Sequence, residues 1–293
     1  MKYVAFEAGG RTGFSAMLFF MSWHQSGDIL YLADDDVAIQ KLTPPSKDIV
    51  YCSTEVAINI LNNEDSVVFP SDELTRQSNT FVRQKAALWC YSDVSAFPYS
   101  KKSANGIIQR LCSETSTQIM VPRTFDITDA FVRPDTFSAG SKGVTSLDNV
   151  CVTENINIKS EYVVDFAVSL TGECQFYGRQ VVLRNGYDRI VKLLPSEHHV
   201  VQSVINLVRH HKSKFIGIWN MQLAENDKGQ LYFIEFAKRR SGTSFVHISQ
   251  GYNPFRFFNG VCDNRMENII KDEKWYRYED YIMKFNSKLY ESL

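Results

Sequence analysis

The chain has 293 residues, of which 44% are hydrophobic and 22% are charged, a balance typical of a protein that buries a sizeable core. This length fits a main domain together with a smaller one, because single domains mostly run to roughly 100–200 residues. The 32 Lys and Arg residues nearly cancel the 33 Asp and Glu residues, and the sequence contains no block of basic residues. A nucleic acid is therefore not an expected partner.

The apolar and cysteine patterns argue against further classes of protein. The longest early apolar run, Phe14 to Trp23, spans about ten residues, whereas a helix that crosses a bilayer needs roughly 20. The chain also lacks the charged start and cleavage pattern of a signal peptide, so we expect a cytoplasmic protein that does not enter a membrane. The 6 cysteines form no CxxC pair, which argues against a zinc site and against a disulfide framework.

The first part of the chain has the pattern of a small α/β domain, which we expect over residues 1–75. Short apolar runs separated by a glycine turn predict a βαβ opening followed by two more parallel strands. The predicted strands cover residues 3–6, 29–33, 48–52 and 66–70, and the predicted helix ends near Trp23.

Two polar segments of this domain have competing interpretations. The turn from Gly9 to Gly13 is typical either of an anion site at a helix N-terminus or of plain turn geometry. The acidic run Asp34-Asp35-Asp36 predicts a solvated turn and helix cap, with a metal site as the alternative.

The remainder, residues 76–293, changes from helical to strand-rich character. Apolar spacing of three and four residues predicts helices over 79–90, 104–112, 195–211 and 264–293. Strand runs cover residues 130–132, 162–170, 174–183, 187–194, 215–224 and 230–236. Asn185-Gly186 and residues 226–229 are good hairpin turns because they tolerate positive φ. We therefore expect mostly antiparallel sheet.

One segment, from Phe131 to Val144, combines a strand that carries Arg133 with a loop of small residues. Small residues let backbone N–H groups approach phosphate oxygens, and a cation on the adjoining strand offsets their charge. The segment therefore predicts a phosphate-binding loop. A surface hairpin rich in serine and glycine is the alternative.

A second segment carries two oxygen-bearing side chains on neighbouring strands. If the runs on either side of the turn at 226–229 pair, Gln222 and Glu235 project toward the same face, where oxygen ligands suit Mg²⁺ that bridges phosphates. Glu235 lies in an apolar strand, so its charge needs a partner there. A metal ion or Arg239 would serve, and a structural salt bridge at the strand end is the alternative.

In this order, these segments resemble the ATP-grasp superfamily, and especially its carbamoyl phosphate synthetase-like and amino-acid ligase branch. The family patterns V-K-P-x-x-G-x-G-S-x-G-V, an acidic hinge strand, E-Y-x-x-D and N-x-Q…I-E-x-N-x-R are similar to residues 132–144, 152–156, 161–165 and 220–239. The resemblance implies an α/β (α+β) ATP-grasp fold over 76–293, with two subdomains around ATP and a C-terminal helix. Residues 1–75 would form a small Rossmann-like domain before it.

The resemblance also implies roles for individual residues. Gln222 and Glu235 would hold Mg²⁺, and Arg239 would stabilise the transferred phosphoryl group, so Glu235 and Arg239 are the predicted catalytic residues. Glu154 would reach the ribose. The predicted nucleotide-binding residues are Lys85, Arg133, Ser138, Gly140, Ser141, Lys142, Gly143, Glu154, Ile156 and Glu161.

Two positions depart from the family pattern. Arg133 stands where the family usually has lysine, which keeps the positive charge but exchanges a point charge for a planar fork. Ala237 stands where the family usually has asparagine, which removes an oxygen ligand for a second magnesium ion. The family's helix lysine that contacts the nucleotide is assigned here to Lys85.

The resemblance implies an ATP- and Mg²⁺-dependent ligase that activates a small carboxylate, such as an amino acid, as an acyl phosphate and joins it to an amine. The sequence does not identify either substrate, and it leaves a homodimer open. A nucleotide-binding protein without ligase turnover is the main alternative, because of Arg133 and Ala237. A Rossmann-type oxidoreductase is a further alternative, against which the absence of a G-x-G-x-x-G turn at residues 9–13 counts.

Overall fold

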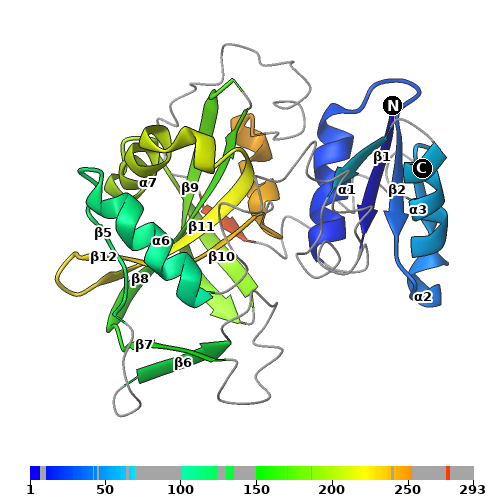
Figure 1. The fold of residues 1–293 in the computed structure, drawn as a ribbon. Coiled ribbons are helices and arrows are strands. Elements are labelled where there is room, and N and C mark those ends of the chain that lie inside the picture. The colour runs from blue at the N-terminus through cyan, green and yellow to red at the C-terminus, as the bar shows by residue number, and fades with distance from the viewer. Residues whose placement is uncertain are drawn as a thin grey trace. The chain divides into compact units, whose positions relative to one another are not determined.

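The computed structural model forms two compact units (Figure 1). It describes residues 1–6, 11–41, 43–44, 46–63, 66–69, 101–123, 130–134, 150–169, 171–185, 187–238, 241–252 and 275–277. Among these, the first unit takes in residues 1–69 and 238–252, and the second takes in 101–237 and 275–277. The boundary expected at residue 75 lies outside the described residues.

The first unit contains a four-stranded parallel sheet in the order β3-β2-β1-β4. Its strands are β1 (Lys2–Phe6), β2 (Ile29–Ala33), β3 (Ile49–Cys52) and β4 (Ser66–Phe69), and its helices are α1 (Arg11–Trp23), α2 (Val37–Gln40) and α3 (Thr54–Asn63). Figure 1 shows α1 and α3 on opposite sides of the sheet. Helices on both faces explain why Val4, Ala5 and Leu30 are fully buried. The predicted βαβ opening and the two further parallel strands are confirmed.

The acidic run at the end of β2 stabilises the turns that follow the strands. Asp36 is the N-cap of α2 and accepts a hydrogen bond from the Ala38 N–H at 2.8 Å. The Asp35 carboxylate accepts from the Thr54 N–H at 2.9 Å, at the start of α3, and Asp34 accepts from the Asp36 N–H at 2.9 Å. The predicted turn and helix cap is thus confirmed.

The chain returns to the first unit after β12 of the second unit. The 3₁₀ helix η4 (Ser244–Gln250) packs against α1. Phe14 and Phe245 meet edge to face with ring centroids 5.9 Å apart, and Phe19 and Tyr252 do so at 5.8 Å. This return was not predicted from the sequence.

The second unit is built on a seven-stranded sheet in the order β13-β10-β9-β8-β11-β12-β5. Its strands are β5 (Ile119–Met120), β8 (Ile158–Val168), β9 (Cys174–Asn185), β10 (Tyr187–Leu194), β11 (Gly217–Asn226), β12 (Leu231–Ala237) and β13 (Trp275–Arg277). The predicted antiparallel pairing holds from β10 to β12, β13 adds to β10 as a further antiparallel strand, and β5 pairs with β12 in parallel. A separate antiparallel pair joins β6 (Ala130–Pro134) and β7 (Val150–Glu154).

Helices α6 (Lys101–Ser113) and α7 (His199–His210) contribute to one hydrophobic core with one face of this sheet, and the short η3 (Lys212–Lys214) follows α7. Alternate residues of β8, among them Val164 and Phe166, and Trp219 of β11 are fully buried in this core. The predicted helices at 104–112 and 195–211 are confirmed, with small shifts at their starts.

The helix expected over residues 264–293 is wrong at Trp275–Arg277, which form the edge strand β13. This segment pairs antiparallel with β10, and Val191 lies opposite Tyr276. Aromatic side chains favour strands where a free sheet edge is present, so pairing overrides the helical spacing. The rest of that expected helix and the one at 79–90 lie outside the described residues.

Candidate active site

The face of the sheet that points away from the α7 core carries polar side chains. Side chains alternate along β8, and residues directly opposite each other on neighbouring strands share a face. Asp165 lies opposite Asn220 of β11, and Gln222 lies opposite Glu235 of β12. We call this surface the polar face. Its members are Glu161, Asp165, Arg179, Asn220, Gln222 and Glu235.

The predicted pair of metal ligands occupies adjoining strands on the polar face. Gln222 and Glu235 are direct Cα partners in the β11–β12 ladder, and both side chains are half-buried. A register irregularity follows Gln222 in this ladder. One carboxylate and one amide oxygen form a donor set of the kind that Mg²⁺ accepts when phosphate oxygens and water complete its shell. The residues present therefore fit a magnesium ion.

Glu235 has a cationic partner that the sequence did not reveal. The Lys101 Nζ lies 3.0 Å from the Glu235 Oε2, and the Lys101 side chain is 8% exposed while that of Glu235 is 31% exposed. Lys101 is the first residue of α6. The helix was predicted to begin at 104, so Lys101 was not a candidate. Arg239, a partner for Glu235 that the sequence suggests, lies outside the described residues.

A buried ion pair lies on the same face, one strand away. Arg179 Nη1 of β9 donates to Asp165 Oδ2 of β8, and the two side chains are 1% and 0% exposed. Charges this deep need each other, because neither is solvated. Asp165 is the last residue of the E-Y-x-x-D segment, so the pair accounts for an acidic residue at that position.

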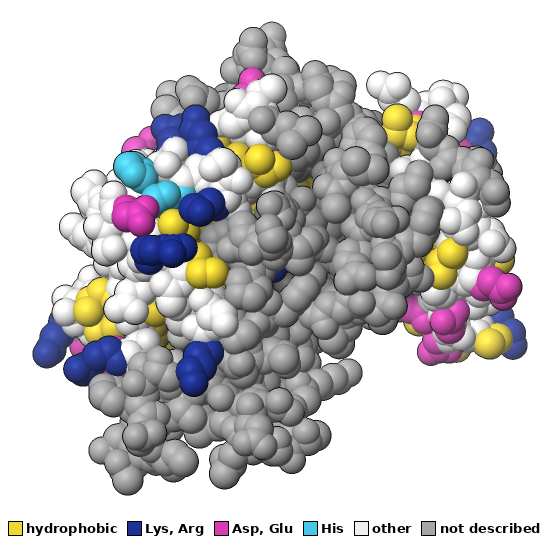
Figure 2. All heavy atoms as spheres, viewed as in Figure 1, with side chains coloured by type: hydrophobic (Ala, Val, Ile, Leu, Met, Phe, Trp, Pro, Cys, Tyr) yellow, Lys and Arg dark blue, Asp and Glu magenta, His cyan; other side chains and the backbone are white. Residues whose placement is uncertain are grey.

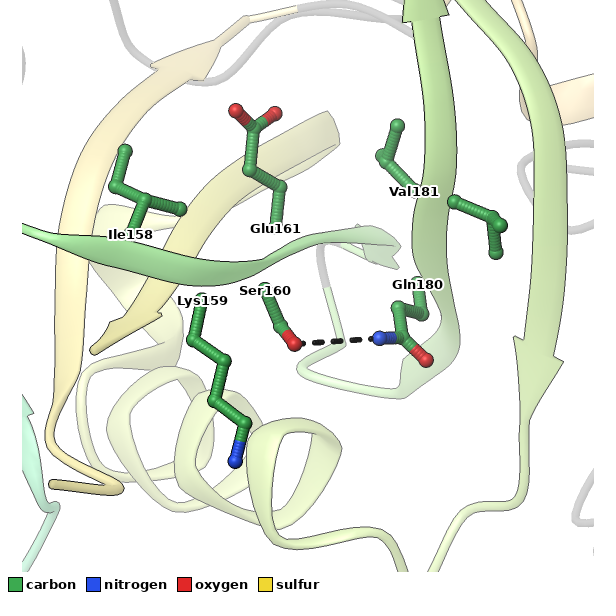
Figure 3. A pocket seen from close by; sticks show the side chains of 7 residues that line it. Ile158, Lys159, Ser160, Glu161, Gln180 and Val181 are labelled. Atoms are coloured by element: carbon green, nitrogen blue, oxygen red, sulfur yellow. Dashed lines mark hydrogen bonds between the residues drawn. The ribbon is translucent and has the colours of Figure 1, made fainter. Parts of the chain in front are cut away.

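A pocket of about 380 Å³ opens at the start of β8, beside the first residue of the same segment. Figure 3 shows Glu161 and Val181 on one side of the strands, and Ser160 and Gln180 on the other. The Ser160 hydroxyl accepts from the Gln180 Nε2 at 3.3 Å. The Glu161 carboxylate is half-buried at this pocket, which suits an acceptor for hydroxyl groups of a ligand.

The segment predicted as the acidic hinge strand, residues 152–156, is held by contacts at Glu154 and at Asn157, the residue that follows it. The Glu154 carboxylate pairs with the Arg123 Nε at 3.0 Å, and the Glu154 N–H donates to the Arg123 carbonyl at 2.8 Å. The Asn157 side chain donates to Asp227, in the β11–β12 turn. Ile156 between them is half-buried.

For the other predicted nucleotide-binding residues, the structure describes no side-chain position. The backbone at Arg133 pairs with Cys151 in the β6–β7 ladder. Lys85, Ser138, Gly140, Ser141, Lys142 and Gly143 lie outside the described residues.

None of the described helices is long and apolar enough to cross a bilayer. The described residues also contain no group of three or more His, Cys, Asp and Glu side chains able to hold a metal. Figure 2 shows basic side chains interspersed with acidic, histidine and uncharged ones on the visible described surface.

Comparison with known proteins identifies the fold. No family model and no curated protein matches the sequence, but solved structures do. An ATP-grasp superfamily protein from Archaeoglobus fulgidus has a TM-score of 0.58 at 15% identity, over 89% of this chain and 88% of that chain. A biotin carboxylase from Campylobacter jejuni, in complex with ATP, has a TM-score of 0.65 at 13% identity, over 87% and 69%.

A third neighbour is N5-carboxyaminoimidazole ribonucleotide synthetase from Thermus thermophilus, with a TM-score of 0.62 at 14% identity, over 89% of this chain and 78% of that chain. The fold expected from the sequence motifs is confirmed. This chain has the ATP-grasp fold.

Proposed function

We propose that this protein is an Mg²⁺- and ATP-dependent ligase that activates a small carboxylate as an acyl phosphate and joins it to an amine. The observation that carries the proposal is the direct opposition of Gln222 and Glu235 on the polar face of a sheet with the ATP-grasp fold. Those two oxygen donors stand at the positions where the sequence motifs require metal ligands.

Magnesium would be held by Gln222 and Glu235, and it would supply neutralisation of the phosphate charge during transfer. The chain's own cations would assist. Lys101 brings a buried ammonium group to Glu235, so it is a candidate to contact a phosphate beside the metal. Arg239, two residues beyond β12, remains the proposed cation for the transferred group.

The nucleoside is assigned to the pocket at the start of β8. Its volume of about 380 Å³ fits part of a nucleotide, and Glu161 offers a carboxylate to the ribose hydroxyls. The Glu154 carboxylate already pairs with Arg123. This ion pair competes with the proposed contact between Glu154 and the ribose. Arg133 and the loop from Ser138 to Gly143 are proposed to bind the phosphates.

The neighbours support this reaction class. One is a Staphylococcus aureus N5-carboxyaminoimidazole synthetase complexed with ADP, and another is a biotin carboxylase domain in complex with MgADP. The identities are 14% and 10%, so the carboxylate and the amine used by this chain are left to experiment. A homodimer and a cytoplasmic location are part of the same proposal.

Considered alone, Ala237 in place of the family asparagine favours the second candidate, a nucleotide-binding protein without ligase turnover. However, Asn220 lies directly opposite Ala237 on the polar face. Asn220 is 2% exposed, and it places an amide on the strand beside the vacated position. This supports ligase turnover over simple binding.

The test is ADP release from Mg-ATP across pools of carboxylates and amines. The expected result is ADP formation that requires one member of each pool. Saturable ATP binding without a product in any pool would instead establish the second candidate.

A further inference from the structure

The Lys101–Glu235 pair is asymmetric in its access to water. The Lys101 side chain is 8% exposed, so its ammonium is almost wholly withdrawn from solvent, whereas the Glu235 side chain is 31% exposed. The contact is 3.0 Å, which is hydrogen-bond distance for a charged pair. A cation from solvent can therefore approach the carboxylate, while the ammonium stays fixed against it.

Lys101 also begins α6. The N-terminus of a helix carries a partial positive charge and disfavours a cation beside it. The position of Lys101 is thus electrostatically unfavourable on its own helix, and the Glu235 carboxylate compensates for it. Another cation bound to the Glu235 carboxylate would weaken this compensation for a buried ammonium.

We propose that Lys101 excludes free divalent cations from Glu235, so that metal binds this carboxylate only together with an anionic nucleotide. The inference rests on the proposed function for the identity of the nucleotide, but not for the behaviour of the ion pair. A divalent ion at Glu235 meets the Lys101 charge at close range, and this repulsion opposes binding. Phosphate oxygens bring negative charge that offsets both cations, and the same site then accepts the metal.

The test measures binding of Mn²⁺ alone, without nucleotide, from the electron paramagnetic resonance signal of the free ion. Mn²⁺ takes the same carboxylate and amide oxygens as Mg²⁺. Lys101→Met should bind Mn²⁺ about tenfold or more tightly than the wild type, because the repulsion is gone. Lys102→Met is the matched control, since Lys102 is the exposed neighbour on the same helix and carries the same charge. Its affinity should stay within about twofold of the wild type.

The double variant Lys101→Met/Glu235→Gln should lose the gain, which locates the ion at the carboxylate. Equal affinity of Lys101→Met and wild type, an equal gain in Lys102→Met, or a gain that survives Glu235→Gln would each overturn the proposal. A measurement that needs no Lys101 variant compares wild type with Glu235→Gln. Both should bind free Mn²⁺ equally weakly, and tight wild-type binding that this substitution abolishes would also overturn it.

Failure of this inference and failure of the ligase are distinguishable. Turnover in the ADP assay without the Mn²⁺ pattern leaves the ligase and removes the role of Lys101. The Mn²⁺ pattern without turnover leaves Lys101 controlling a metal site in a protein that is not a ligase.

Discussion

The ion pair at Lys101 and Glu235 determines what a single substitution of the carboxylate does. Glu235→Gln removes the charge that would hold Mg²⁺, so ADP release should fall by orders of magnitude. It also leaves the Lys101 ammonium, 8% exposed, without its carboxylate. The free energy of unfolding should therefore fall, by less than the roughly 3–5 kcal/mol of a fully buried pair, because Glu235 is 31% exposed. Urea denaturation without ligand measures this loss.

The double variant Lys101→Met/Glu235→Gln separates the two effects. With both partners neutral, stability should recover most of the loss, while ADP release stays at the level of the single variant. Full activity of Glu235→Gln would end the metal assignment.

Tyr162 gives a prediction for alkaline pH. Its hydroxyl donates to the Glu225 carboxylate at 2.7 Å. Burial, followed by the hydrogen bond to Glu225, raises the pKa of Tyr162 from 10.0 to about 12. A raised pKa in the folded state means that the stabilisation is complete below the unfolded pKa of 10.0 and is lost as pH rises toward 12.

Between these pH values, the free energy of unfolding should fall less steeply in Tyr162→Phe than in the wild type. Urea denaturation at a series of pH values gives both slopes. Parallel slopes would show that the phenol does not couple to folding.

The sequence predicted Gln222, Glu235 and Glu161 as candidates because each stands in a motif with fixed spacing. It could not identify Lys101, whose neighbour Lys102 is identical in chemistry. Only the packing of α6 buries Lys101 and leaves Lys102 exposed at the surface. A residue whose role depends on burial by distant segments leaves no local pattern.

At the scale of elements, alternation and turn chemistry predicted the β9–β10 and β11–β12 hairpins, because these signals are local. The two-residue strand β5 was not predicted, and the edge strand β13 was predicted as part of a helix. Each is too short for a period and forms only because a partner strand offers its edge.

Gly178 fixes how closely α7 packs on β9. A Cβ at this position would overlap the Val201 Cγ2 of α7 and contact Leu194 at 3.4 Å. Gly178→Ala should therefore destabilise the protein by about 1–3 kcal/mol, the usual cost of overpacking. Gly106→Ala is the matched control, because its Cβ would enter open space on α6, and it should stabilise by about 0.5–1 kcal/mol. Thermal unfolding of both variants measures the difference, and equal effects would mean that α7 yields without strain.

At the scale of the whole molecule, the two units have separate cores. Phe245 is fully buried in the first unit and Phe215 in the second. Phe245→Ala should cost about 3–5 kcal/mol and accelerate amide hydrogen exchange in β1 and β2 while β8 stays protected. Phe215→Ala should give the opposite pattern. Uniform acceleration in both variants would show that the units unfold together.

The return of the chain to the first unit has a consequence for folding during synthesis. Phe14 and Phe19 of α1 leave the ribosome early, but their partners Phe245 and Tyr252 follow more than two hundred residues later. Domains usually fold in the order in which they are made. Here the second unit has all its strands except β13 before the first unit receives η4. The first unit therefore gains η4 only after β5 to β12 of the second unit have been synthesised, and α1 lacks its contacts with Phe245 and Tyr252 until then.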